Sequence, residues 1–259
     1  MPEYPFDLTD QVAIITGGGT GIGEATAKIF ATQGAHSVIA SRKLANLERV
    51  AGEVTGATGR RCVPVATDVR EEDQVRSLVR RTIEEFGRVD ILVNNSGGSY
   101  RFDLVDTPSE RWDNMVSLNL RSAFVATREA GAHMIEQGRG AIVNISSAVG
   151  LHGGAGFAAY GAAKAGLQNF TRSVALEWGK FGVRANCIAV GLIASEGARR
   201  AWDRMGSLES MLEHAGVPED IGYPILFLAS EASRYMSGET FEVAGGQYGL
   251  GGWDEAAPT

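Results

Sequence analysis

The stretch that decides the fold is Val12-Ala13-Ile14-Ile15-Thr16-Gly17-Gly18-Gly19-Thr20-Gly21-Ile22-Gly23. It joins a short apolar run to a glycine cluster, and residues 24–33 follow with the composition of a helix that Gly34 ends. Glycines let the backbone turn tightly, and the amino end of a helix offers amide donors at the positive end of its dipole. A strand, a glycine-rich turn and a helix in this order predict a site for the phosphates of a nucleotide.

Strand-like and helix-like segments alternate along the rest of the chain. We expect strands at residues 12–15, 37–40, 62–66, 90–93, 141–147, 183–190 and 240–243. We expect helices at residues 24–33, 43–54, 72–86 and 109–137, then one that carries Tyr160 and ends near residue 180, and a last one at 221–230. This alternation favours one α/β domain over residues 1–259, a doubly wound, mostly parallel sheet of about seven strands with helices on both faces.

Two prolines and two cysteines refine this prediction. Pro64 indicates that its strand lies at an outer position or that the proline is near a strand end. We place Pro224 in the first turns of the last helix, where backbone amides lack partners and a missing N–H costs little. Cys62 and Cys187 lie in apolar runs, which favours buried free thiols over a disulfide or a metal pair, and we expect no metal site.

Composition restricts the partners. The chain has 259 residues and a formal net charge of −7, which argues against nucleic acid or an anionic membrane as its main partner. No apolar run reaches the ~18 residues of a membrane span. The first residues lack the basic start and apolar core of a signal peptide. We therefore expect a cytoplasmic protein that acts on a small molecule.

Three side chains point to proton-transfer chemistry. Tyr160 and Lys164 lie four residues apart in an alanine-rich stretch, so on a helix they share a face. A neighbouring ammonium lowers the pKa of a tyrosine from its usual ~10, which suits a general acid or base. Ser147 ends a β-branched run, where the carboxyl end of a strand presents a hydroxyl. Chance spacing of the three residue types is the alternative, and the glycine motif argues against it.

The glycine spacing and this pair together resemble a known family. Gly17, Gly21 and Gly23 give G-x-x-x-G-x-G, which with the Tyr-x-x-x-Lys pair resembles the Rossmann-fold short-chain dehydrogenase/reductase family. Other matching stretches are Thr67-Asp68-Val69, Asn94-Asn95-Ser96-Gly97, Asn119 and Asn144-Ile145-Ser146-Ser147. The chain departs from the family pattern at Ser96, where the family has alanine, and at Val190, where it has proline.

The resemblance implies an oxidoreductase that transfers a hydride between a nicotinamide dinucleotide and a carbonyl or secondary alcohol. Tyr160 would be the general acid/base, and Ser147 would hold the substrate oxygen. Lys164 would bind the nicotinamide ribose and lower the pKa of Tyr160. Asn119 would hold a water that links Lys164 to solvent.

The resemblance also implies a cofactor site. Asp68 would bond the adenine amino group, the Val69 amide would lie on the ring, and Asn95 and Gly97 would line the adenine ribose. Ile193 and Ser195 would bond the nicotinamide carboxamide. The full set of expected cofactor-binding residues is Gly17, Thr20, Gly21, Ile22, Gly23, Ser41, Arg42, Asp68, Val69, Asn95, Gly97, Tyr160, Lys164, Ile193 and Ser195.

The second strand decides between NAD and NADP. An NAD enzyme usually carries a carboxylate at its end, whereas this chain has Ser41-Arg42-Lys43. A guanidinium suits the 2′-phosphate of NADP(H) through paired hydrogen bonds. The alternative is that these basic residues form a solvated helix start. Thr20 occupies the position where many NADP enzymes carry a second basic residue. We expect NADP(H) rather than NAD.

The substrate side leaves alternatives open. Residues 99–104, 148–157 and 191–216 should line the pocket, with 191–216 as a lid over an apolar substrate or as ordinary surface helices. His152 either touches the substrate or is a plain loop histidine. The glycine motif and Ser41-Arg42-Lys43 also resemble those of enoyl- and dienoyl-coenzyme A reductases. Arg199, Arg200 and Arg204 could receive a phosphate of coenzyme A or could form a solvated helix face. In those enzymes the motif tyrosine is typically replaced, so Tyr160 favours carbonyl chemistry. A non-catalytic nucleotide-binding protein is a further alternative, against which the intact catalytic residues argue.

Assembly is the last expectation. The helices at 109–137 and up to 180 carry many small or apolar residues, more than one sheet can cover. The resemblance implies that these helices pair across a two-fold axis and that the last strand and tail form a second contact. We therefore expect a homotetramer, or failing that a dimer, in which the irregular, glycine-rich tail 245–259, with Tyr248 and Trp253, docks near a neighbouring subunit.

Overall fold

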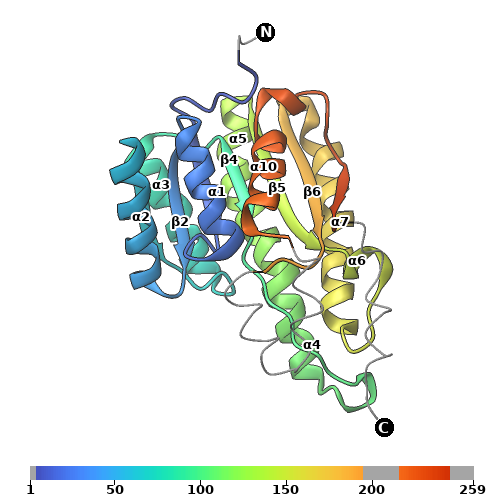
Figure 1. Cartoon of the computed structure of the whole chain (residues 1–259). Helices are drawn as coiled ribbons and strands as arrows, with labels where there is room; N and C mark the ends of the chain where they lie inside the picture. The colour runs from blue at the N-terminus through green and yellow to red at the C-terminus, as the bar shows by residue number, and fades with distance from the viewer. Residues whose placement is uncertain (1–3, 195–215, 246–259) are drawn as a thin grey trace.

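A parallel β-sheet forms the centre of the molecule (Figure 1). The computed structural model describes residues 4–194 and 216–245. In this part of the chain seven strands run in the order β3-β2-β1-β4-β5-β6-β7, and every neighbouring pair is parallel. The strands are β1 (Val12–Thr16), β2 (His36–Ser41), β3 (Cys62–Ala66), β4 (Ile91–Asn94), β5 (Gly140–Ser147), β6 (Val183–Val190) and β7 (Thr240–Val243). The predicted doubly wound sheet is confirmed.

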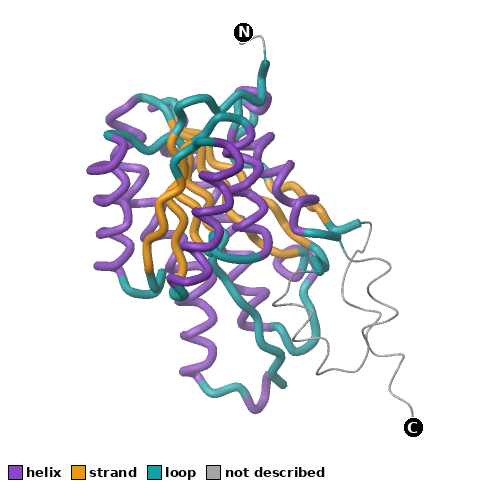
Figure 2. The backbone as a smooth tube through the Cα atoms, turned by 60° about the vertical axis from the view of Figure 1, so that its left-hand side comes forward, coloured by secondary structure: helices purple, strands orange, loops and turns teal. Residues whose placement is uncertain are grey.

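Helices cover both faces of the sheet, as Figures 1 and 2 show. One face carries α1 (Gly21–Thr32), α2 (Leu44–Thr58) and α10 (Pro218–Ala229). The other carries α3 (Glu72–Phe86), α5 (Ser122–Gln137) and α7 (Ala158–Trp178). Two further helices are α4 (Ser109–Val116), which continues through a π-helical segment (Ser117–Arg121) into α5, and the short α6 (Val149–His152). Single 3₁₀ turns lie at Leu104–Asp106, Gly179–Phe181 and Glu231–Ser233.

The core consists of two apolar clusters, one on each face. In β1 the side chains of Ala13 and Ile15 belong to the α1/α2/α10 cluster, and Ile14 belongs to the other. All five residues of β1 are buried. A parallel sheet is buried on both faces, so its strands are continuous apolar runs and not alternating ones. This explains why the strands could be located closely from the sequence.

Most element positions match the prediction, and the starts of the first and last helices do not. The first helix begins at Gly21 and not at residue 24, and the last begins at Pro218 and not at residue 221. Pro218 occupies the first helical position, and Val217 N donates to Asp220 Oδ2 at 2.8 Å. The placement of Pro224 in the first turns was therefore wrong, because it lies inside α10.

Pro64 and the cysteines lie where they were expected. Pro64 is in β3, which is an edge strand. Cys62 and Cys187 are both buried and free. Across residues 4–194 and 216–245, no helix is long and apolar enough to cross a membrane.

Several predictions fall outside the described residues. They concern Ser195, most of the predicted lid with Arg199, Arg200 and Arg204, and the tail with Tyr248 and Trp253. The cytoplasmic location and the single domain over residues 1–259 also stay predictions.

Candidate active site

The glycine-rich loop joins the end of β1 to the start of α1. Gly17 has φ +69°, and a Cβ there would lie 2.6 Å from Asn95 Nδ2. A Cβ at Gly23 would collide with the carbonyl oxygen of Gly17. Thr20 precedes the first helical residue, and its side chain forms no capping hydrogen bond. The loop therefore folds closely on itself and leaves the first amides of α1 without a side-chain partner.

Asn95 fixes this loop from the neighbouring strand. Its Nδ2 donates to Thr16 O at 2.9 Å and to Gly17 O at 3.3 Å. In return, Thr16 Oγ1 accepts from the backbone N of Asn95 and of Ser96, both at 3.0 Å. These bonds join the carboxyl ends of β1 and β4, where the strand order changes direction. Ligands of doubly wound folds bind at this point.

A cavity of about 560 Å³ opens beside the loop. Its lining includes Gly17, Thr20, Gly21, Ile22, Ser41, Arg42, Asp68, Val69, Asn95 and Gly97, all predicted to bind the cofactor. Gly19, Lys43, Asn46, Thr67, Ser96 and Leu118 also line it and were not predicted. Asn46 was missed because the sequence gives no signal for which face of α2 turns toward the loop. A similar cavity of about 570 Å³ lies at the opposite sheet edge beside Tyr4 and Arg60, and holds none of the predicted residues.

Four described residues of the predicted cofactor-binding set do not line this cavity: Gly23, Ile193, Tyr160 and Lys164. Gly23 packs behind the loop, against Gly17. Ile193 follows β6, where it forms an isolated bridge with Gly216. It does not line the cavity that the structure describes.

Charge is concentrated at one end of the cavity. The carboxylate of Asp68 accepts hydrogen bonds from Arg70, whose guanidinium lowers the pKa of Asp68 to about 2. The side chains of Arg42 and Lys43 line the same cavity. Among the hydrogen bonds and ion pairs of the described residues, neither of these two side chains takes part.

Tyr160 and Ser147 meet at the carboxyl end of β5. Ser147 is the last residue of that strand, and Tyr160 lies in the first turn of α7. Burial raises the pKa of Tyr160, and the nearby Ser147 side chain partly offsets this rise. The two hydroxyls that were expected to share a substrate oxygen are thus side by side.

Lys164 is buried one turn further along α7. Its Nζ donates to Ile145 O at 2.7 Å and lies 5.7 Å from the centroid of the Tyr160 ring. Burial lowers the pKa of Lys164 to about 8. In this structure burial is the larger effect on the phenol and raises the pKa of Tyr160, and a lowering of that pKa by Lys164 stays a prediction.

Asn119 lies in the π-helical segment between α4 and α5. Its Nδ2 donates to Met115 O and Gly98 O, both at 3.0 Å, and its Oδ1 accepts from Gly98 N at 3.1 Å. A Cβ on Gly97 would lie 2.8 Å from Asn119 Oδ1 and 3.3 Å from Lys164 Nζ. Asn119 and Lys164 therefore approach the same point, and π-bulges of this kind are frequent at functional sites.

Gln168 supports the site and was not predicted. It lies four residues after Lys164 on the same face of α7, and it is buried. Its Nε2 donates to Ser146 Oγ at 3.0 Å, and Ser146 Oγ donates to Lys164 O at 2.9 Å. The helical spacing Tyr160, Lys164, Gln168 is the signal that could have identified it.

His152 is paired with a residue of the last strand. Its Nε2 lies 2.8 Å from Glu242 Oε1 of β7, which ties α6 to the sheet edge. This pairing gives His152 a structural partner and favours the plain loop role.

Comparison with known proteins agrees with this geometry. Residues 11–206 match the family model described as short chain dehydrogenase. A peroxisomal 2,4-dienoyl-CoA reductase of Danio rerio is 37% identical over 94% of this chain and 83% of its own length. The 3-oxoacyl-[acyl-carrier-protein] reductase FabG of Thermotoga maritima is 35% identical over 92% of this chain and 98% of its own.

Solved structures give the same result. A short-chain type dehydrogenase/reductase from Mycobacterium marinum superposes with a TM-score of 0.88 at 32% identity, covering 94% of this chain and 97% of that one. Levodione reductase superposes with a TM-score of 0.85 at 31% identity, covering 93% and 98%. Members of the matched family are oxidoreductases that bind NAD or NADP and act on small molecules. The fold, the motifs and these matches together show that this chain belongs to the short-chain dehydrogenase/reductase family.

Proposed function

We propose that this protein transfers a hydride between NADP(H) and a carbonyl or secondary-alcohol substrate, with Tyr160 as the general acid/base. The observation that carries the proposal is the approach of the Tyr160 phenol and the Ser147 side chain to each other at the carboxyl end of β5. Two hydroxyls that converge on one substrate oxygen stabilise the negative charge that develops there during reduction. A carbonyl oxygen needs such donors, whereas a carbon–carbon double bond offers no oxygen at the reacting position.

The residues of the cavity fit a nicotinamide dinucleotide. The tightly folded glycine loop and the uncapped first turn of α1 offer amide donors for the pyrophosphate. Asp68 and Val69 would hold the adenine, Asn95 and Gly97 its ribose, and Lys164 the nicotinamide ribose. Ile193 and Ser195 stay proposals for the carboxamide. When bound, the nicotinamide supplies or accepts the hydride.

The titration of the two buried side chains suits proton donation. Because burial raises the pKa of Tyr160, its phenol is protonated at neutral pH and can donate to a carbonyl oxygen. Lys164, with a pKa of about 8, carries a positive charge under the same conditions. That charge stabilises the phenolate left after the transfer. Asn119, which approaches the same point as Lys164, is placed to hold a water that returns the proton.

Arg42 and Lys43 support NADP(H) over NAD(H). Both line the cavity near Asp68, and neither is engaged by another described side chain. An uncompensated guanidinium at the end of β2 favours a 2′-phosphate over a hydroxyl.

The segments predicted to contact the substrate support an apolar one. Phe102 N donates to Gly156 O at 2.9 Å, which joins two of these segments beside Tyr160. Tyr100, Leu104 and Leu151 expose apolar surface on the same segments. We also propose a homotetramer, since α5 and α7 keep exposed apolar side chains such as Phe124 and Leu176.

A dienoyl-coenzyme A reductase is the second candidate, and the 37% identity with the enzyme of that name in Danio rerio favours it. The presence of Tyr160 beside Ser147 argues against it, because the coenzyme A reductases that this chain resembles typically replace that tyrosine. A non-catalytic role is opposed by the complete set Asn119, Ser147, Tyr160 and Lys164.

The test is NADPH consumption with a panel of ketones, diketones and enoyl thioesters. In the Tyr160→Phe variant, ketone turnover should fall by about 10²–10⁴-fold while NADPH still binds, because only the proton donor is lost. Tyr235→Phe, at a fully exposed tyrosine, is the matched control and should leave turnover unchanged. Near-normal ketone reduction by Tyr160→Phe would show that another acid acts, and unchanged reduction of enoyl thioesters would favour the second candidate.

A further inference from the structure

The loop between β3 and α3 carries an ion pair between Arg70 and Asp68, and Asp68 lines the cofactor cavity. Arg70 Nε donates to Asp68 Oδ1 at 3.0 Å, and Arg70 Nη2 donates to Oδ2 at 2.5 Å. The backbone N of Arg70 adds a third bond to Oδ1 at 3.0 Å. This fork engages both oxygens of the carboxylate and compensates its charge. A carboxylate has about four lone-pair directions, so Asp68 keeps room for one more donor, such as an amino group of a base.

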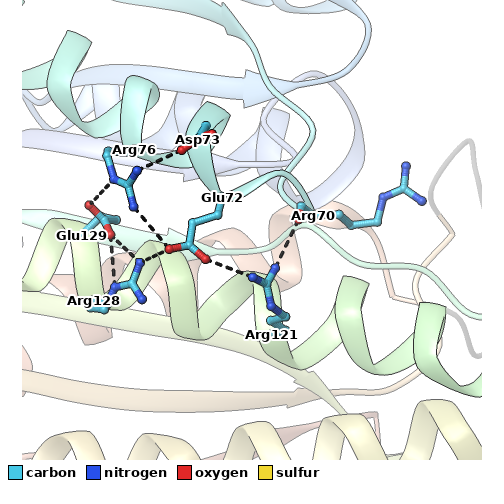
Figure 3. A network of polar contacts seen from close by, with 7 residues as sticks. All are labelled: Arg70, Glu72, Asp73, Arg76, Arg121, Arg128 and Glu129. Atoms are coloured by element: carbon cyan, nitrogen blue, oxygen red, sulfur yellow. Dashed lines mark hydrogen bonds and ion pairs between the residues drawn. The ribbon is translucent and has the colours of Figure 1, made fainter.

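The backbone of Arg70 is held from the opposite side. Arg121, at the end of the π-helical segment, donates from Nη1 to Arg70 O at 3.3 Å and from Nη2 to Glu72 Oε2 at 3.0 Å. Glu72 is itself bound by Arg76 and Arg128. Figure 3 shows this network with the Arg70 side chain pointing away from it. The network therefore anchors the loop while the guanidinium of Arg70 is directed to Asp68.

Asp68 also lies near a second arginine. Arg42 and Asp68 line the same cavity, and Thr67 N donates to Ser41 O at 2.9 Å, which joins the two loops that carry them. The positive charge of Arg42 contributes to the low pKa of Asp68. Asp68 thus has two arginines within its electrostatic reach, and in the described structure only Arg70 is bonded to it.

We propose that Arg70 is a specificity-determining residue for the dinucleotide, which holds Asp68 in a forked ion pair and so keeps Arg42 available for the 2′-phosphate. The inference rests on the proposed NADP(H) function. Without Arg70, the carboxylate of Asp68 would be free to pair with Arg42. It would also repel a phosphate group that carries about −1.5 to −2 charges.

The experiment is a double-mutant cycle on the full chain, in which dissociation constants for NADPH and NADH are measured by calorimetric titration. Arg70→Ala should weaken NADPH binding about threefold to tenfold and NADH binding less than about twofold, because only the phosphate competes with Asp68 for Arg42. In the Asp68→Asn background, Arg70→Ala should weaken NADPH binding by less than about twofold, since no carboxylate remains for Arg70 to hold.

Two controls complete the design. Arg80→Ala removes an exposed arginine of α3 that pairs with Glu84, outside this network, and it should leave both dissociation constants unchanged. Arg42→Ala should weaken NADPH about tenfold or more with little effect on NADH. If Arg42→Ala weakens NADPH binding and Arg70→Ala does not, the role of Arg70 is overturned and the cofactor assignment stays intact.

Other outcomes also decide. If Arg70→Ala weakens NADPH binding equally in the wild-type and Asp68→Asn backgrounds, the proposal is overturned, because Arg70 would then act directly on the nucleotide. Equal weakening of NADPH and NADH would also overturn it, because the pair would then only support the loop. If Arg42→Ala leaves NADPH binding unchanged, the proposed cofactor itself is wrong, and the role of Arg70 falls with it.

Discussion

At the scale of single residues, burial moves the two titrating groups of the site in opposite directions on the pH scale. The pKa of Lys164 falls to about 8, and the pKa of Tyr160 rises. In both cases the neutral form is favoured, because a dry environment disfavours charge. The protein therefore keeps a buried ammonium at neutral pH at a cost to its stability.

This cost predicts a pH dependence of folding. Below pH 8 the lysine is charged in both states. Between pH 8 and its ordinary pKa of 10.5, the unfolded chain binds a proton that the folded chain does not, so stability rises with pH. From about pH 7.5 to about pH 9.5, the free energy of unfolding of the wild type should gain about 1–2 kcal/mol relative to Lys164→Met.

Urea denaturation at the two pH values measures this difference. Tyr160 is present in both proteins, so its own titration cancels in the comparison. Parallel pH profiles for the wild type and Lys164→Met would contradict a lowered pKa of Lys164.

Sequence predicted Ser147, Tyr160 and Lys164 as one site, because helical spacing and a strand end are local features. It could not predict that Lys164 Nζ donates to Ile145 O, since that contact depends on how α7 packs on β5. The pairing of Arg70 with Asp68 was missed for a different reason. Asp68 lies in the matching stretch Thr67-Asp68-Val69 and Arg70 follows it directly, but nothing in their spacing says that the guanidinium turns toward Asp68.

At the scale of elements, the end of α10 depends on one arginine of β6. The last carbonyls of a helix have no partner within it. Arg184 donates to the carbonyl oxygens of Leu228 and Ser230 at 3.0 and 3.1 Å. It also donates to Ser233 Oγ at 3.0 Å and to Met236 O at 3.3 Å. Burial lowers the pKa of Arg184.

Removing this arginine should loosen the helix that covers α1. Arg184→Ala should lower the free energy of unfolding by about 1.5–3 kcal/mol, because several buried carbonyls lose a charged donor. Arg184→Lys should recover only part of the loss, since an ammonium lacks the planar fork. Chemical denaturation of both variants, with Arg234→Ala at an exposed site as the control, checks the prediction. Equal midpoints for Arg184→Ala and Arg234→Ala would refute it.

The elements differ in how well sequence predicts them. Strands were placed within about one residue, because both faces of a parallel sheet are apolar. The start of α10 was wrong although Pro218 and Asp220 mark it locally, and Pro224 was misplaced as a consequence. A Cβ on Gly222 would lie 2.5 Å from Ile29 Cδ1, so α10 packs tightly on α1. The π-helical segment and the short α6 leave no periodic signal in the sequence.

At the scale of the whole molecule, the outer faces of α5 and α7 are unusually apolar for a single chain. Leu176 is 85% exposed and Phe124 is 41% exposed, and the Phe124 ring contacts that of Phe170 with centroids 6.2 Å apart. Exposed apolar side chains on two neighbouring helices are typical of a subunit interface.

For the proposed tetramer, which needs two kinds of two-fold contact, light scattering should give a particle of about four times the mass of one chain. The double variant Phe124→Glu/Leu176→Glu should give a smaller particle, because like charges would be buried in the interface and repel each other. Leu44→Glu, at an exposed site on α2, is the control and should leave the mass unchanged. A stable, fully active monomer in the wild type would contradict the proposed tetramer.

The hydrogen bonds between Asn95 and Thr16 also have a kinetic consequence. The two residues lie 79 positions apart in the chain, so the glycine loop reaches its final shape only after β2 and β3 have formed and β4 has paired with β1. Contacts between distant positions form slowly during folding, because a long loop must close first. A nascent chain with only its first three strands contains the whole glycine motif and still lacks the hydrogen bonds between Asn95 and Thr16. The dinucleotide can therefore stabilise only molecules whose two half-sheets have already joined, and its binding makes that late step harder to reverse.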